Sequence, residues 1–338
     1  MMQILSKFKK SSVSDSNLKV EPGTGKFSTF AGVFTPSILS ILGVVMFMRA
    51  NMVVGYAGVY GALLILLISK SITATTGLSI SAIATNTDVK GGGAYYLISR
   101  TLGPEFGATI GLTLFIAQSL SIPFYVLGFS ESLVRTFPII QPYFQIISFV
   151  IVSGLFLVTW KGAEWAIKTQ YVIMALLIIS ILAFTTGAIL KFDNSILTAN
   201  KMPQFTQNFT FTILLAIYFP AVTGILAGVN MSGDLKNPGR SIPLGTMAAI
   251  AVGAIIYGGQ MILCGGSINR DELIANPYHS LINLAPFHTG FLVVMGVFCA
   301  TLSSALGALL AAPRVLQSLG QDRLLKPVNF FAKLSTTG

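Results

Sequence analysis

The sequence predicts an all-α integral membrane protein with about eight spans, of which the first and the sixth are interrupted. Of its 338 residues, 53% are hydrophobic and only 9% are charged, and the mean hydropathy of +0.78 is well above soluble globular usage. Apolar runs near the bilayer-crossing length of about 20 residues recur along the chain. Glycine, proline and hydroxyl residues interrupt two of these runs.

Eight apolar runs define the expected spans. They cover approximately residues 30–48, 56–83, 106–134, 139–159, 166–190, 209–229, 242–264 and 291–312. We therefore expect a transmembrane domain over residues 30–319, a polar cytosolic tail over 1–29 and a cytosolic segment over 320–338. The tail contains no short apolar region followed by a small-residue cleavage site, so a removable signal peptide is not expected.

The formal net charge of +10 is explained by the distribution of basic residues between alternate loops. With a cytoplasmic N-terminus, fifteen of the 21 lysines and arginines fall on the cytoplasmic side and Lys70 lies within a span. Five fall outside: Arg49, Arg135, Lys191, Lys201 and Arg270. This asymmetry predicts a multi-pass protein with its N-terminus in the cytoplasm, and it accounts for the basic charge without nucleic acid as a partner.

The first span, "TPSILSILGVVMFMR", and the sixth, "FPAVTGILAGVN", each place a hydroxyl residue and a glycine near mid-membrane. Lipid cannot satisfy free backbone groups, so such breaks are tolerated mainly where the backbone is buried or lines a polar cavity. The breaks lie five spans apart, as an inverted five-plus-five repeat would place them. For either span alone, close helix packing through small residues is the alternative explanation.

Each break is suited to ions of both signs. The carbonyl groups that end the incoming half-helix carry partial negative charge and favour a cation. The N–H groups that begin the outgoing half-helix carry partial positive charge and favour an anion. In the eighth span, Thr301, Ser303 and Ser304 supply hydroxyl oxygens suited to a small cation, although small residues also favour helix contact.

Lys70 lies near the middle of the second span, where an ammonium is costly and usually functional or internally paired. The sequence shows no acidic partner for it. Two interpretations stay open: a tethered amine that substitutes for a transported cation, or a side chain that faces a wet crevice toward the cytoplasm. The second is the simpler and is favoured.

Charged residues also cluster near the external end of the third span. Glu131 and Arg135 are four residues apart and suit an ordinary helical ion pair, while Arg49 at the end of the first span offers Glu131 a second partner. Either pairing would place opposite charges at the mouth of a pathway. Side chains that simply reach the membrane interface are the alternative.

Several function classes are excluded. The stretch "VKGGGAYYLISRTLGPEFG" lacks the Gly-Lys-Ser/Thr ending and the preceding strand of a phosphate loop, so nucleotide binding is rejected. No span contains paired carboxylates, a histidine-centred constellation or a metal-ligand cluster. Cys264 and Cys299 match no metal or redox spacing. We therefore expect no enzyme activity and no cofactor.

Three segments carry a resemblance to a known family: "SAIATNTDVKGGGAYYLISRTLGPEFGATIGL", "FPAVTGILAGVNMSGDLKNPGRSIPLGT" and "ATLSSALGALLAAPRVLQ". Together they closely resemble the sodium-potassium-chloride branch of the cation-chloride cotransporters, within the amino acid-polyamine-organocation superfamily. The resemblance covers about residues 30–325. It implies an inverted-repeat fold in the plasma membrane and secondary active, electroneutral symport of sodium, potassium and chloride by alternating access, with the lipid bilayer and small inorganic ions as partners.

The resemblance also implies ion sites, carried over by motif. The implied potassium ligands are the carbonyls of Ser40, Ile41 and Pro220, the Thr223 hydroxyl and the Tyr125 phenol. The implied sodium ligands are the carbonyls of Leu39, Leu42 and Ala300 and the hydroxyls of Ser303 and Ser304. Chloride would meet the N–H groups of Gly43, Val44 and Val45, and a second chloride those of Gly224, Ile225 and Leu226. Arg49 and Glu131 match the external gate pair.

The chain departs from this family in three respects, one of which is Lys70, a residue without a recognised counterpart in the family. Ser40 stands where the family commonly has asparagine. The chain also stops shortly after span eight, whereas the family has twelve spans, so the second repeat and the second chloride site are expected to be incomplete. The sequence leaves open a fragment, a homodimer, a second chain that supplies the missing spans, or a subunit that does not transport. An amino acid or polyamine permease of the same superfamily is the alternative transport function.

Overall fold

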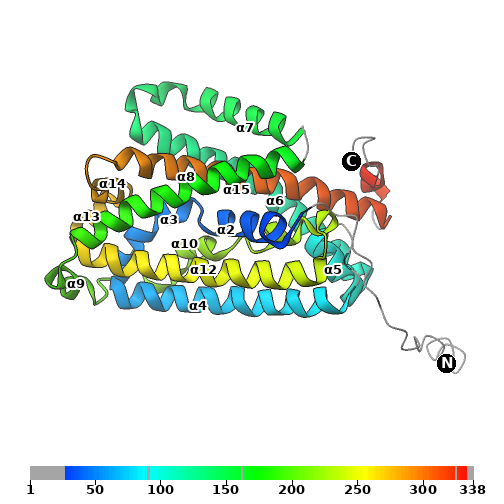
Figure 1. Ribbon diagram of the computed structural model, residues 1–338, viewed down its shortest axis with the longest axis horizontal. Helices are drawn as coiled ribbons and strands as arrows, with labels where there is room; N and C mark the ends of the chain where they lie inside the picture. Colours follow the sequence, from blue (N-terminus) through cyan, green and yellow to red (C-terminus); the bar gives the residue numbers. More distant parts are fainter. Residues whose placement is uncertain (1–26, 88, 90–91, 161–162, 324–325, 333–338) are drawn as a thin grey trace, which may run out of the picture.

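Eight segments of the computed structural model are long and apolar enough to cross a membrane (Figure 1). The structure describes residues 27–87, 89, 92–160, 163–323 and 326–332, so the tail expected over 1–29 lies almost wholly outside the described residues. All eight expected spans are found, and several extend beyond the apolar runs that predicted them. The described residues contain no β-strand, only two isolated bridges.

The first five spans contain one broken helix and four long ones. Span one consists of η2 (Phe30–Phe34), α2 (Thr35–Ile41) and α3 (Val44–Met48). Spans two to five are α4 (Ala50–Asn86), α6 (Pro104–Thr136), α7 (Phe144–Trp160, preceded by η3, Pro138–Tyr143) and α8 (Ala163–Leu190). The short helix α5 (Gly93–Leu102) lies between spans two and three.

The remaining spans begin with a second broken helix. Span six consists of α10 (Phe211–Tyr218), η4 (Phe219–Val222) and α11 (Leu226–Val229), and spans seven and eight are α12 (Pro238–Ser267) and α15 (Gly290–Gln321). The shorter elements are α9 (Asn194–Asn200), η5 (Ser232–Asp234), α13 (Arg270–Ala275), α14 (Pro277–Leu284) and η6 (Lys326–Ala332).

The broken first span occupies the centre of the bundle. In its most apolar window 83% of the residues are buried, whereas none are buried in the corresponding window of span four. Around this centre α12 runs beside α4, and α15 packs along α6 and α8 (Figure 1). Gly77 permits the close approach of α4 to α12, since a methyl group there would lie 2.8 Å from Ile250 Cδ1. A broken span has to be buried in protein, because lipid cannot form hydrogen bonds with the backbone groups that the break leaves unpaired.

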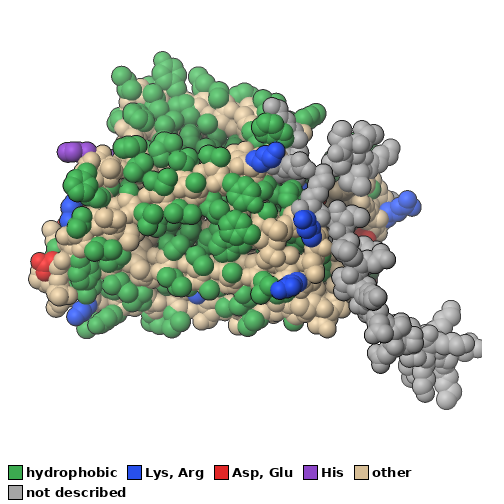
Figure 2. Space-filling model, in the orientation of Figure 1, with side chains coloured by type: hydrophobic (Ala, Val, Ile, Leu, Met, Phe, Trp, Pro, Cys, Tyr) green, Lys and Arg blue, Asp and Glu red, His purple; other side chains and the backbone are tan. Residues whose placement is uncertain are grey.

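The outer helices expose the apolar side chains expected of a lipid-facing surface. Phe149, Leu157 and Trp160 on α7 are all more than half exposed. In the space-filling view, hydrophobic side chains cover much of the length of the bundle, while most charged side chains lie toward its two ends (Figure 2). The chain is therefore a multi-pass membrane protein, as its composition predicted.

Polar contacts tie the segments together at the end of the bundle that carries α5, called here the α5 end. Arg314 on α15 forms a 2.6 Å ion pair with Asp234. The Phe27 N–H donates to the Asp234 carbonyl (2.9 Å), which attaches the segment before span one to the segment after span six. The Tyr95 hydroxyl donates to Asp322 (2.7 Å), and burial, followed by this bond, raises the pKa of Tyr95 to about 12. The opposite end, which carries α9, α13 and α14, is called the α13 end.

Candidate functional site

The first span breaks between α2 and α3. Leu42 and Gly43 leave helical geometry, with ψ angles of 49° and −162° respectively. The Leu42 N–H makes the last bond of the first half, to the Ile38 carbonyl (2.8 Å). In the part of the chain that the structure describes, no backbone hydrogen bond crosses from α2 to α3. Carbonyl and N–H groups that a continuous helix would pair are thus free for other partners.

The sixth span breaks after η4. Thr223 is extended, and Gly224 has a φ of 96°, in the left-handed region that side chains other than glycine rarely adopt. The Thr223 hydroxyl donates to the Pro220 carbonyl (2.8 Å). The chain then resumes as α11, and no described backbone hydrogen bond joins η4 to α11. The predicted second break is therefore present. The helix ends on either side of it, which carry partial charges, lie within the span.

The fold brings the two breaks into contact. A methyl group added at Gly224 would lie 2.5 Å from Ser40 Cβ and 3.4 Å from the Ile41 nitrogen, so a side chain cannot be accommodated there without movement. The Gly228 N–H donates to the Ser37 hydroxyl (3.2 Å), which links the two broken spans again. Residues far apart in sequence therefore form one polar region inside the bundle.

The residues of the implied sodium set converge between α2 and α15. The hydroxyls of Ser303 and Ser304 both donate to the Ala300 carbonyl, at 3.0 and 2.9 Å. All three residues are at most 2% exposed. A methyl group at Gly43 would lie 3.5 Å from Ser304 Oγ, which places the first break beside these hydroxyls. The flanking Leu39 and Leu42 are also buried. The Ser303 and Ser304 hydroxyl oxygens and the Ala300 carbonyl oxygen are thus buried close together, and no carboxylate belongs to this set.

The implied potassium set surrounds the end of α2 and has a partner that sequence reasoning missed. The Tyr257 hydroxyl, from α12, donates to the Ile41 carbonyl (2.8 Å). Tyr125 on α6 packs against the same core and is half-buried, as is Ser40. Pro220 and Thr223 are joined by the hydroxyl bond described above. The structure therefore brings Ser40 and Ile41 of the first break close to Gly224 of the second break, and it adds the Tyr257 phenol to the end of α2.

A second missed residue, Gln260, lies one turn further along α12. Its Nε2 donates to the Met46 carbonyl of α3 (2.9 Å). Tyr257 and Gln260 are three apart in the apolar stretch "IIYGGQMIL", and therefore share one helix face. The sequence signal that could have identified Tyr257 and Gln260 is the presence of two polar side chains on one face of an otherwise apolar span. They support the two halves of span one, one on each side of its break.

The two implied chloride sets lie where the outgoing half-helices begin. Gly43, Val44 and Val45 are buried at the start of α3, and Gly224, Ile225 and Leu226 lead into α11. Both sets follow a break directly, so their N–H groups include those that a continuous helix would have paired. Side chains at these positions are aliphatic or absent, and any polar contact made here involves the backbone.

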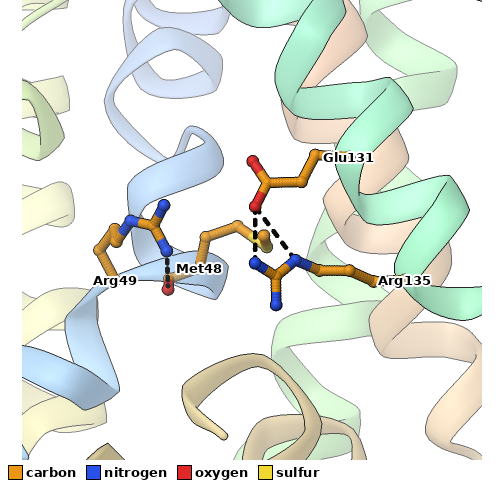
Figure 3. A network of polar contacts seen from close by, with 4 residues as sticks. All are labelled: Met48, Arg49, Glu131 and Arg135. Carbon is orange, nitrogen blue, oxygen red and sulfur yellow. Dashed lines mark hydrogen bonds and ion pairs between the residues drawn. The ribbon is translucent and has the colours of Figure 1, made fainter. Parts of the chain in front are cut away.

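At the α13 end, the structure does not pair Arg49 with Glu131 (Figure 3). Glu131 instead binds Arg135, one turn along α6, through two contacts of 2.8 and 3.0 Å. The Arg49 guanidinium lies against the Met48 carbonyl, at 3.5 Å. Of the two pairings that the sequence allowed, this conformation contains the helical one, and the implied gate pair is apart.

Lys70 does not face water, contrary to the interpretation that the sequence favoured. It is 7% exposed, and its Nζ has no hydrogen-bond partner among the described residues. The sequence placed Lys70 near mid-span, but it could not show that α12 and α2 enclose the side chain.

Comparisons with known proteins identify the family of the chain. A family model described as amino acid permease matches residues 32–338. Solute carrier family 12 member 1 from Homo sapiens is 37% identical over 368 residues, which cover 93% of this chain and 33% of that protein. Solute carrier family 12 member 2 from Squalus acanthias is 36% identical over 363 residues, with 92% and 30% covered. The chain thus spans about a third of the length of these relatives.

A solved structure shares the fold. It is a Na⁺-coupled sialic acid symporter in a substrate-bound, outward-open state. The TM-score is 0.61 at 15% sequence identity, and the match covers 90% of this chain and 68% of the other. This likeness confirms the predicted fold class, and the breaks in the first and sixth spans are those described above.

Proposed function

Because the chain belongs to the amino acid permease family, we propose that it carries the ion-binding core of a secondary active symporter for sodium, potassium and chloride. Its relatives in solute carrier family 12 confirm the resemblance to the cation-chloride cotransporters. The observation that carries the proposal is that the buried Ser304 hydroxyl lies beside Gly43 of the first break, next to Ser303, and that both hydroxyls are bonded within α15 to the Ala300 carbonyl. A buried cluster of neutral oxygens suits a small alkali cation better than an organic substrate.

Each ion uses a different part of the two breaks. Sodium binds between α2 and α15, with the carbonyls of Leu39 and Leu42 completing the serine oxygens. Potassium binds at the end of α2 and at η4, where carbonyls replace part of its hydration shell and Tyr125 contributes a phenol oxygen. Chloride binds at the starts of α3 and α11, where N–H groups carry partial positive charge. Binding ions of both signs together keeps the loaded site near neutrality.

Alternating access requires a gate on each side of this site. At the α13 end, Glu131 exchanges Arg135 for Arg49 as the external side closes. At the α5 end, the Arg314–Asp234 pair holds spans six and eight together in the present conformation. We propose that the protein lies in the plasma membrane. Its α5 end faces the cytoplasm, since basic residues in the loops favour that side. A homodimer, or a complex with a second chain, is proposed as the assembled form.

The alternative within transport is an amino acid or polyamine permease, which the family description also suits. The close contact of Gly224 with Ser40 favours ions, because it leaves little room for an organic side chain between the breaks. A subunit that does not transport is the third candidate. The uptake experiment described next distinguishes this candidate from the two transport functions.

Tracer uptake into proteoliposomes tests the proposal. We expect rubidium uptake that is lost when sodium is replaced by N-methylglucamine and also when chloride is replaced by gluconate. The double variant Ser303→Ala/Ser304→Ala should raise the half-saturating sodium concentration at least tenfold, since loss of about 1.4 kcal/mol corresponds to that factor. Measurement over a range of sodium concentrations gives this value directly.

Ser153→Ala is the matched control for the serine variants. Ser153 lies on α7, is half-buried, and its hydroxyl bonds only locally to the Phe149 carbonyl. It should leave sodium dependence unchanged. Rubidium uptake that needs neither sodium nor chloride would contradict the proposal. Uptake of labelled leucine or putrescine without rubidium would favour the permease, and uptake of none of them would favour the subunit.

A further inference from the structure

Lys70 lies within α4, inside the second span, and protein encloses its side chain. The residue is 7% exposed, and its Nζ has no hydrogen-bond partner in the part of the chain that the structure describes. None of the ion pairs formed among the described residues includes it. A charged group inside a membrane is costly and usually belongs to an ion pathway or an internal pair. Lys70 has no fixed pair, which makes a mobile ion the partner to consider.

Three spans meet around the Lys70 ammonium. On α12, a methyl group added at Gly253 would lie 3.1 Å from Lys70 Nζ and 2.7 Å from Ile41 Cγ2. Glycine at this position therefore leaves the room that both side chains occupy. One turn further along α12, the centroid of the Tyr257 ring lies 5.9 Å from Nζ, within the range of a cation–π interaction.

Tyr257 connects this ammonium to the first break. Its ring faces Lys70, and its hydroxyl donates to the carbonyl of Ile41, the last residue of α2. The carbonyl end of a helix carries partial negative charge. The Lys70 charge is thus held beside the end of the half-helix at which the transported potassium is proposed to bind, and before the N–H groups proposed for chloride.

We propose that Lys70 is a built-in cation of the ion site, whose charge weakens the binding of potassium and strengthens the binding of chloride. This inference rests on the proposed function, because it adds Lys70 to the same site. For unit charges about 10 Å apart at an effective dielectric constant of about 20, the effect on affinity is on the order of tenfold. The effects on the two ions have opposite signs. A loss of packing would weaken both ions together.

Ion binding can be measured without transport, because an ion that binds the folded protein raises its thermal stability. Rubidium and chloride are each titrated against the purified full chain. We expect Lys70→Met to lower the half-saturating rubidium concentration and to raise that of chloride, each on the order of tenfold. Lys70→Arg retains the positive charge and should resemble the wild type for both ions.

Lys168→Met is the matched control, since Lys168 is exposed and lies over the Trp165 ring on α8. It removes the same charge elsewhere and should shift neither ion. Equal values in wild type and Lys70→Met, or a shift of both ions in the same direction, would overturn the inference while the proposed symport stands. A wild type that neither ion stabilises would overturn both. Lys70→Gln carries the same test if Lys70→Met does not fold.

Discussion

At the residue scale, the Ile41 carbonyl shows how one backbone group can serve two purposes. A carbonyl oxygen has two lone pairs, and the Tyr257 hydroxyl uses one of them. The second remains available to a cation. Tyr257 thereby satisfies a buried group when no ion is bound, and it keeps the end of α2 in place for an ion to enter. The fully buried Tyr257 ring also packs edge-on against Tyr218, with ring centroids 5.7 Å apart.

Tyr257→Phe should therefore lower the free energy of unfolding by about 1 kcal/mol, the usual contribution of one buried hydrogen bond. The ring packing is retained, so the loss belongs to the hydroxyl. Thermal unfolding of the purified protein without rubidium measures it. Tyr143→Phe is the control, because Tyr143 is 58% exposed on η3 and should give no change. Equal losses in the two variants would show that the Ile41 bond does not stabilise the fold.

At the element scale, the two breaks differ in how strictly they need glycine. Gly43 has a φ of −85°, which any residue can adopt. Gly224 has a φ of 96° and also touches Ser40 of the other broken span. The second break thus depends on glycine for its backbone conformation and for the contact that joins the two breaks. Neither half of span six is long enough to be stable alone, so this contact helps to position α11.

Gly224→Ala should consequently destabilise the protein by about 1–3 kcal/mol, the cost of a strained backbone position, and should abolish rubidium uptake. The matched control is Gly154→Ala on α7, where an added methyl group meets no atom within 4 Å and helix propensity favours alanine. We expect the control to transport normally with unchanged or slightly higher thermal stability. Normal uptake by Gly224→Ala would mean that the second break does not shape the ion site.

At the scale of the whole molecule, polar contacts join segments at both ends, and the contacts that join spans one, six and eight lie at the α5 end. At the α5 end, Arg314 binds Asp234 and also donates to the Asn230 carbonyl, while Phe27 is joined to the same loop. At the α13 end, Arg49 and Glu131 remain apart. The described residues thus hold spans one, six and eight together at the α5 end, and the opening of that end requires these contacts to separate.

Arg314→Ala should increase exposure at the α5 end severalfold. The measurement is labelling of a cysteine introduced at Ala227 by a thiol reagent that does not cross the membrane, applied from the α5 side. Cys264 and Cys299 are buried and contribute little background. Arg100→Ala is the control, since it removes the Arg100–Asp322 pair at the same end without touching span six. Equal labelling in both variants would rule out the Arg314–Asp234 pair as a restraint on opening.

The sequence by itself determined the membrane class, the eight spans and the positions of both breaks. These properties follow from local composition, because apolar length and helix-breaking residues act within one segment. The sequence also predicted the paired serines, Ser303 and Ser304, and the first half-helix of each broken span, since each lies within a short motif.

Only the tertiary structure decided which side chains meet across spans. It paired Glu131 with Arg135 rather than Arg49, enclosed Lys70 between α12 and α2, and brought Tyr257 to the Ile41 carbonyl. In a membrane, nearly every span is apolar on several faces, so hydrophobic periodicity does not reveal which face of α12 turns toward span one. Partner choice therefore depends on close packing at glycines such as Gly253, and that packing exists only once the spans have assembled.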